Sequence, residues 1–107
     1  MTESDLDEFR RIYERHVEHV RSGDMKAAIA DMVSENVPAV FDGVDVPRSA
    51  AQDAQIVGVR ADGDRRIGES VYRMTDRSIG LRSIWESRGG RWLAADLENF
   101  EAPGADA

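Results

Sequence analysis

Apolar and aromatic residues near the start of the chain recur at the spacing of one helical face. They are Leu6, Phe9, Ile12, Tyr13, His16, Val17 and Val20. Most of the intervening positions are charged, so one face of the helix is expected to be buried and the other to meet water. Gly23 predicts the end of this helix, because glycine readily adopts the left-handed conformation that follows a helix C-terminus.

A second, shorter helix is predicted over residues 24–33, with Asp24 as its N-cap. Only a short corner separates it from the first helix, so the two are expected to pack side by side or against a common sheet. The apolar run Val37–Phe41 predicts a short strand. Pro38 places that strand at a sheet edge, because proline has no backbone N–H to donate.

The pattern changes to that of β-strands after residue 53. Four strands with short turns between them are predicted, over Ala54–Ala61, Arg65–Thr75, Ser78–Glu86 and Arg91–Phe100. Long neighbouring strands preceded by helices are typical of an α+β fold, with the helices on one face of an antiparallel sheet. We expect a single domain over residues 1–100 and a flexible C-terminal tail over 101–107.

Composition and charge exclude several classes of function. The chain has 107 residues, a net charge of −7 and no cysteine, so it forms no disulfide and offers no thiolate for metal binding or catalysis. An acidic domain repels phosphates, so no nucleic-acid partner is expected. No apolar run has the roughly 18–20 residues of a membrane helix. Because the acidic N-terminus also lacks the layout of a signal peptide, we expect a cytoplasmic protein without a membrane partner.

Two segments resemble a known superfamily. The helix corner "VRSGDMKAAIADMVSENV" and the closing hairpin "RSIWESRGGRWLAADLENF" are similar to those of nuclear transport factor 2-like proteins, above all the small SnoaL-like and ketosteroid-isomerase-like bacterial members. The resemblance implies a cone, in which a curved antiparallel sheet wraps around the N-terminal helix pair and encloses an apolar pocket. It also implies enzymes that isomerise, cyclise or hydrate by proton transfer without a cofactor, or members that only bind partners. Dimers through the outer sheet face are common in the superfamily.

The chain departs from this pattern in two places. The superfamily normally has a third helix after the first strand, whereas here the chain offers only Pro47–Gln52, so that helix is expected to be shortened or absent. The cone would then have an open mouth, or one closed by a second subunit. The isomerases also carry an acid on the penultimate strand, where this chain has Leu81–Trp85 without a carboxylate. A complete steroid-isomerase oxyanion hole is therefore not expected.

Three residues are the main catalytic candidates. By the resemblance, Tyr13 corresponds to the tyrosine donor of the isomerases and Asp42 to their general base. His16 shares the buried helix face with Tyr13 and could shuttle a proton. The plainer interpretations are a tyrosine and a histidine that pack in the core, and an aspartate of an Asp-Gly turn. The pair His16 and His19 has helical metal-ligand spacing but lacks a clear third ligand, so no metal site is predicted.

A further candidate lies on the last strand. Pairing residue 86 with residue 91 predicts Trp85 opposite Trp92 and Leu81 opposite Asp96, which would make Asp96 a polar group of the pocket. Because some hydrolases of the superfamily use an Asp-Arg-Asp set, Asp96 and Asp42 with an arginine form a minor alternative. The Trp pair could equally be core packing or a dimer face. The candidate substrate-binding residues are Phe9, Phe41, Tyr72, Arg82 and Trp85.

Two functions follow, and the sequence leaves both open. The first is a cofactor-free isomerase or cyclase of the SnoaL-like kind, acting on an apolar, carbonyl-bearing metabolite with Asp42 as base, Tyr13 as oxyanion donor and His16 assisting. The second is a non-catalytic, dimeric ligand- or protein-binding module. The enzyme requires Tyr13, His16 and Asp42 to meet at one cavity. The binding module predicts a solvent-facing Asp42 and a cavity that is shallow or filled by aromatic rings.

Overall fold

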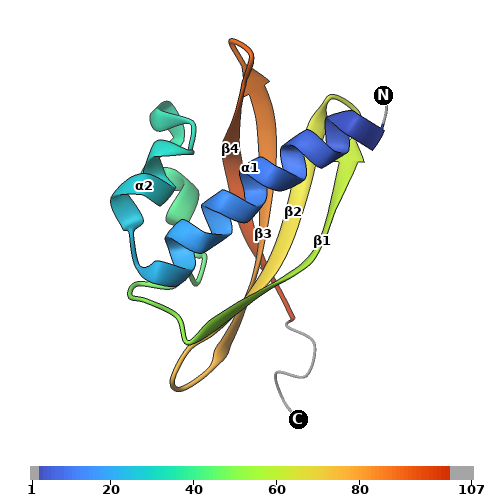
Figure 1. Ribbon diagram of the computed structural model, residues 1–107. Coiled ribbons are helices and arrows are strands. Elements are labelled where there is room, and N and C mark those ends of the chain that lie inside the picture. Colours follow the sequence, from blue (N-terminus) through green and yellow to red (C-terminus); the bar gives the residue numbers. More distant parts are fainter. Residues whose placement is uncertain (1–2, 102–107) are drawn as a thin grey trace.

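The computed structural model describes residues 3–101 and shows helices followed by a four-stranded sheet (Figure 1). The elements are α1 (Glu3–Ser22), α2 (Met25–Ala30), the 3-10 turns η1 (Ser34–Asn36) and η2 (Ala39–Phe41), and strands β1 (Asp53–Asp62), β2 (Arg65–Arg73), β3 (Ser78–Arg88) and β4 (Arg91–Phe100). The strands form an antiparallel meander in the order β1-β2-β3-β4. The predicted α+β class is confirmed. Apart from Glu101, the predicted tail lies outside the described residues.

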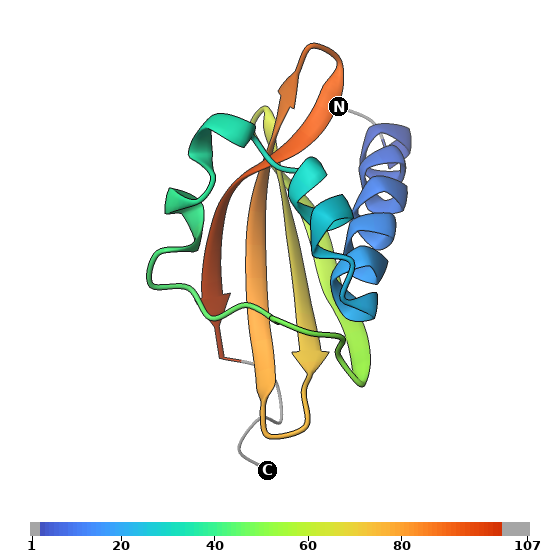
Figure 2. The same cartoon turned by 90° about the vertical axis from the view of Figure 1, so that its left-hand side faces the viewer.

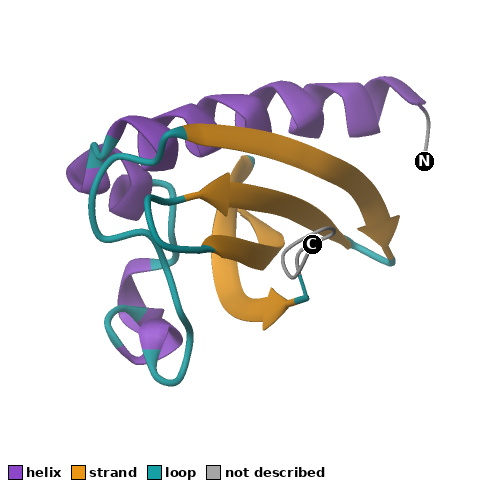
Figure 3. Cartoon of the chain, turned by 90° about the horizontal axis from the view of Figure 1, so that it is seen from below, coloured by secondary structure: helices purple, strands orange, loops and turns teal. Residues whose placement is uncertain are grey.

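Helix α1 crosses the inner face of the sheet, and α2 lies beside it on the same face (Figure 2). The residues that α1 buries are those of the predicted stripe, including Phe9, Tyr13 and Val17. Trp85 of β3 meets this stripe and is completely buried. The sheet is strongly curved (Figure 3). Buried side chains of α1, α2 and the sheet form one hydrophobic core. None of the described helices is long and apolar enough to cross a membrane.

The corner between the helices forms as predicted, but α2 is shorter than expected. Gly23 has a φ of +82°, and the Asp24 side chain accepts a hydrogen bond from the Ala27 N–H. The prediction that the helix continues to residue 33 was wrong. The chain instead joins the edge of β4, where the Ala94 N–H donates to the Asp31 carbonyl at 2.9 Å and the Val33 N–H donates to the Ala94 carbonyl at 2.8 Å. These sheet bonds replace the helical bonds of the last turn.

The prediction of a strand over Val37–Phe41 was also wrong. The segment follows η1 and contains η2 instead, and its backbone N–H groups donate to carbonyls three residues earlier, as in Val37 to Ser34 and Phe41 to Pro38. Its apolar side chains still reach the core, so the hydrophobic run indicated burial correctly but not the backbone conformation. Between Phe41 and Asp53 the described chain contains no helix, as expected from its departure from the superfamily pattern at Pro47–Gln52.

The register of the β3–β4 hairpin differs from the predicted one. Arg88 pairs with Arg91 across a two-residue turn in which Gly89 and Gly90 have φ values of +61° and +79°. A bulge near Ile84 and Trp85 shifts the pairing further. Trp85 therefore lies opposite Ala94, Trp92 opposite Ser87, Leu81 opposite Asn99, and Asp96 opposite Ile84. The predicted Trp85–Trp92 and Leu81–Asp96 pairs do not form.

Candidate functional site

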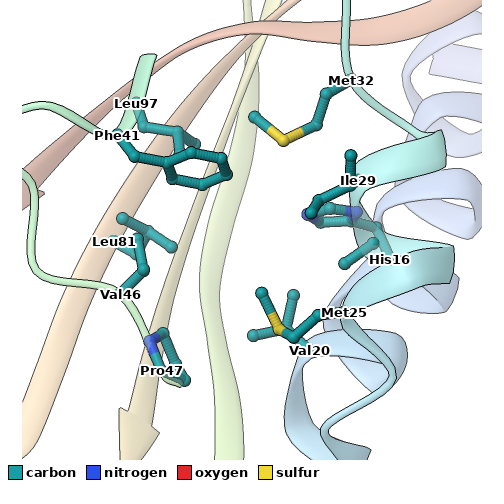
Figure 4. Close-up of a pocket in the computed structure, with 11 residues that line it drawn as sticks. His16, Val20, Met25, Ile29, Met32, Phe41, Val46, Pro47, Leu81 and Leu97 are labelled. Carbon is teal, nitrogen blue, oxygen red and sulfur yellow. The ribbon is translucent and has the colours of Figure 1, made fainter. Parts of the chain in front are cut away.

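An apolar hollow lies between α2 and the segment 38–48, over the inner face of the sheet. Its inner part has a volume of about 30 Å³, and its outer part, about 480 Å³, opens to solvent. Five residues line both parts, namely Met25, Ile29, Phe41, Val46 and Pro47. Figure 4 shows Met25, Ile29 and Met32 facing Phe41, Leu81 and Pro47 across the hollow, with His16 behind Ile29.

Helical spacing explains one wall of the hollow. Met25, Ile29 and Met32 are four and three positions apart, so α2 and the residues that follow it turn these side chains to the same side. The opposite wall comes from the irregular segment, and β3 and β4 contribute Leu81 and Leu97. A loop takes the place of the superfamily's third helix and leaves the outer part of the hollow open. Two flexible methionines in one wall favour a site that adapts to its occupant.

Polar contacts hold the segment 38–48 against the sheet edge. The Asp45 N–H donates to Asn99 Oδ1 at 2.8 Å, and Asn99 Nδ2 donates to the Asp45 carbonyl at 2.9 Å. The Arg77 guanidinium donates to both carboxylate oxygens of Asp45, at 2.9 and 3.0 Å. These bonds from Arg77 hold the pKa of the Asp45 carboxyl below its usual value. The contacts fix the far end of the segment that carries Phe41.

His16 is the one polar side chain in the lining of the inner part. The residue is 7% exposed, and its Nδ1 lies 3.0 Å from Oδ2 of Asp31, which directly follows α2. The other Asp31 oxygen lies 3.9 Å from the Arg91 guanidinium. The Trp85 ring meets the imidazole at a right angle, with 5.1 Å between ring centroids. The buried imidazole is thus held by a carboxylate and an aromatic ring.

Sequence reasoning missed Asp31. It follows the buried Ala28 by three positions, and this spacing could have placed it on the side of α2 that faces α1. Nothing in the sequence alone gives the angle between the two helices, and that angle decides whether the carboxylate reaches His16.

Tyr13 lies away from the hollow. Its hydroxyl forms a hydrogen bond with the completely buried Ser70. Ser83, which also lies beside the Tyr13 hydroxyl, accepts a hydrogen bond from Trp85 Nε1 at 2.8 Å. Burial raises the pKa of the Tyr13 hydroxyl. Phe9 stacks on Tyr13 with ring centroids 5.9 Å apart and is itself fully buried. Neither residue lines the inner or the outer part of the hollow.

The remaining candidates are spread over the molecule. Phe41 lines both parts of the hollow, whereas Asp42 is exposed at the rim of the outer part. Asp96 is exposed, and its carboxylate accepts a bond from the Leu97 N–H. Arg82 bonds to Glu69 and Glu98 instead of an aspartate. Tyr72 is buried in the core, and that burial raises the pKa of its hydroxyl.

The structure therefore brings His16 and Phe41 to the hollow, with Trp85 packed against His16 in the core. It does not gather Tyr13, His16 and Asp42 at one cavity, nor does it assemble the Asp-Arg-Asp set. Within residues 3–101 no group of three histidine, aspartate or glutamate side chains could hold a metal ion. The chemistry available at the hollow is that of one imidazole paired with one carboxylate.

Comparisons with known proteins identify the fold. No family model and no curated protein match the chain. Among solved structures, it is similar to an NTF-2-like protein of unknown function from Burkholderia xenovorans LB400, with 18% identity over 92% of this chain and 90% of the other, and a TM-score of 0.60. It is also similar to an NTF2-like protein of unknown function from Shewanella baltica OS155, with 10% identity over 95% and 98% of the two chains and a TM-score of 0.63. The chain has the nuclear transport factor 2-like fold.

Proposed function

We propose that the protein binds a small apolar molecule in the hollow between α2 and the segment 38–48, without transforming it. The observation that carries this proposal is the continuous apolar lining of Met25, Ile29, Phe41, Val46 and Pro47, which reaches from the open outer part to the inner part. Concave, mainly apolar sites with few polar groups are typical of small-molecule binding. The 3-10 turn that carries Phe41 and the short helix α2 form the two sides that would close on the ligand.

The placement of the catalytic candidates supports a binding role. Asp42 faces solvent at the rim, and the Tyr13 hydroxyl is bonded to Ser70 within the core. Buried aromatic rings fill the interior beneath α1, so the inner part of the hollow retains only about 30 Å³. This combination is the one that the binding module predicts.

The test uses a charge placed in the lining. Ile29 is 39% exposed, so Ile29→Lys should leave the fold intact while it puts an ammonium group beside any apolar ligand. Val57→Lys is the matched control, because Val57 is 49% exposed and lies on β1, outside the hollow. Calorimetric titration with polycyclic and polyketide-like compounds should show binding to the wild type and the control, and about tenfold weaker binding or none to Ile29→Lys. Equal affinities in all three proteins, or no binding to any, would contradict the proposal.

A second candidate function is proton-transfer catalysis, as in a SnoaL-like isomerase or cyclase acting on a carbonyl-bearing metabolite. The pairing of His16 with Asp31 favours it, because a carboxylate that orients a histidine makes the other ring nitrogen available as a base. In this mechanism His16, and not Asp42, would act as the general base. Tyr13 would act only by packing, since its hydroxyl is bonded to Ser70.

A solvent-exchange assay tests this candidate without knowledge of the substrate. In D₂O, a base in the hollow would remove a proton from the carbon next to a ketone of a probe such as 2-tetralone and return a deuteron. Proton NMR should then show enzyme-dependent deuterium uptake that falls about 10²- to 10⁴-fold in His16→Gln and is retained in Asp42→Asn. Deuterium uptake no faster than in buffer would contradict catalysis and leave only the binding function.

A further inference from the structure

The inner end of the hollow presents one unpaired acceptor to its occupant. His16 is more than nine-tenths buried, and every other residue lining this inner part is apolar. Its Nδ1 is bonded to Asp31, while Nε2 has no hydrogen-bond partner among the described residues. Nε2 is not fully enclosed by the protein. An occupant that covers it would leave it buried without a partner, at a cost in free energy, unless the occupant donates a hydrogen bond to it. A ligand that provides this partner is therefore favoured over one that does not.

Asp31 decides which partner the imidazole needs. An ionised carboxylate only accepts hydrogen bonds, so the proton of a neutral His16 must lie on Nδ1 and the lone pair on Nε2. The position of Asp31 is itself fixed, because its backbone carbonyl accepts a bond from the Ala94 N–H. The perpendicular Trp85 ring holds the plane of the imidazole. In its neutral form His16 therefore offers an acceptor, and a carbonyl or ether oxygen would meet it lone pair to lone pair.

The two volumes of the hollow match a ligand with two unlike ends. The inner part of about 30 Å³ has room for a single polar group of the size of a water molecule. The outer part of about 480 Å³, between Met25, Ile29, Phe41 and Pro47, has room for an apolar ring body. A polar group at one end of such a body would lie next to His16 while the body remains between the two walls.

We propose that the ligand of this hollow is a small apolar alcohol or phenol whose hydroxyl group donates a hydrogen bond to Nε2 of His16, with Asp31 as the positioning residue. This inference rests on the proposed binding function and names the chemical class of its ligand. It distinguishes hydroxyl compounds from the ketones expected of an isomerase substrate.

The experiment compares three probes with one ring system. The probes are 2-naphthol, its near-isostere 2-methylnaphthalene, and 2-methoxynaphthalene, whose oxygen only accepts. Calorimetric titration of the wild type should show 2-naphthol binding about tenfold or more tightly than both others, although its hydroxyl is better hydrated. In His16→Phe, which keeps a ring at this position, the preference for 2-naphthol should disappear. Equal binding of the three probes to the wild type would overturn this inference and leave the proposed function standing, whereas no binding of any probe would count against both.

The position of the proton on the His16 imidazole provides a second measurement, which can be made on the wild-type protein. Long-range ¹H–¹⁵N NMR of the wild type should show a proton on Nδ1 and none on Nε2, and Nε2 should shift when 2-naphthol is added. Asp31→Asn should reduce the preference for 2-naphthol, because an amide can also donate to Nδ1 and so permits the other tautomer. A proton found on Nε2 of the free wild type, or an unchanged preference in Asp31→Asn, would overturn the inference.

Discussion

Tyr13 lies directly over the backbone of Gly68, and this contact explains both residues. A side-chain carbon at position 68 would come within 2.5 Å of the Tyr13 ring, closer than such atoms approach one another in proteins. The missing side chain lets the ring reach Ser70 on the same strand, where the two hydroxyls bond. Close packing against Gly68 and a buried hydrogen bond to Ser70 thus hold the Tyr13 side chain in the core.

We expect Gly68→Ala to destabilise the protein by about 1–3 kcal/mol, the usual cost of overpacking a core. Gly58→Ala is the matched control, since Gly58 lies on the neighbouring strand and an added carbon there meets nothing within 4 Å. Urea unfolding followed by Trp fluorescence gives both values. A loss in Gly68→Ala no larger than that in Gly58→Ala would show that the ring moves aside without cost.

Among the structural elements, the segment from Asp31 to Val46 departs most from expectation. Its residues are apolar enough for a helix end and a strand, yet the segment bonds to the β4 edge and then turns. Asp45 fastens its end through Arg77 and Asn99. Because Phe41 lies between the two attachments, these contacts hold one wall of the hollow in place.

The Asp45 attachment should make stability depend on pH in a known direction. Arg77 depresses the pKa of Asp45 in the folded protein, so its contribution is present above the ordinary carboxyl pKa of about 3.9 and is lost as the pH falls further. The pair is half exposed to solvent, and screening keeps the contribution small. Asp45→Asn should lower Tm by a few degrees at pH 7, and the gap should close towards pH 3.

Asp42→Asn serves as the control for this measurement. Asp42 lies on the same segment, is exposed and forms no ion pair with the described residues, so its variant should follow the wild type throughout. Circular dichroism melts at intervals from pH 7 to pH 3 provide the comparison. A gap between Asp45→Asn and the wild type that does not change with pH would contradict the assigned role of the ion pair.

Considered as a whole, the molecule presents an outer sheet face that no other part of the described chain covers. A row of alternating charges crosses it, in which Arg60 and Arg82 bond to Glu69, and Arg82 also bonds to Glu98, at 2.7 to 2.9 Å. Burial acts to raise the pKa of Glu69, but the two arginines outweigh it and hold that pKa below its usual value. Of the two interpretations of Trp85, core packing or a dimer face, its complete burial beneath α1 supports core packing.

The homodimer through the sheet stays a prediction. Ile84 on β3 and Leu93 on β4 are half-buried beside the charged row and would form the apolar part of such a contact. Sedimentation velocity should show a dimer for the wild type and for Ile29→Glu, which changes the opposite side of the molecule, and a monomer for Ile84→Glu. A wild type that sediments as a monomer at high micromolar concentration would refute the prediction.

The sequence by itself determined the order of the two helices and the four sheet strands, most of the strand limits and the inward face of α1. These features follow from local spacing, since apolar residues at helical or alternating positions need only a neighbouring surface to bury them. It also identified His16 and Phe41 as candidate residues of the site. Sequence alone did not predict the hairpin register, because the two-residue glycine turn shifts the pairing by two residues and the bulge shifts it by one more.

Only the tertiary structure decided which candidate residues meet. His16 and Asp31 are 15 positions apart on two helices, and their contact depends on how those helices cross. The same packing bonded Tyr13 to Ser70, left Asp42 in solvent and opened the hollow beside α2. Local patterns determine which side chains are buried, whereas the partner of a buried polar group depends on the three-dimensional arrangement of every element around it.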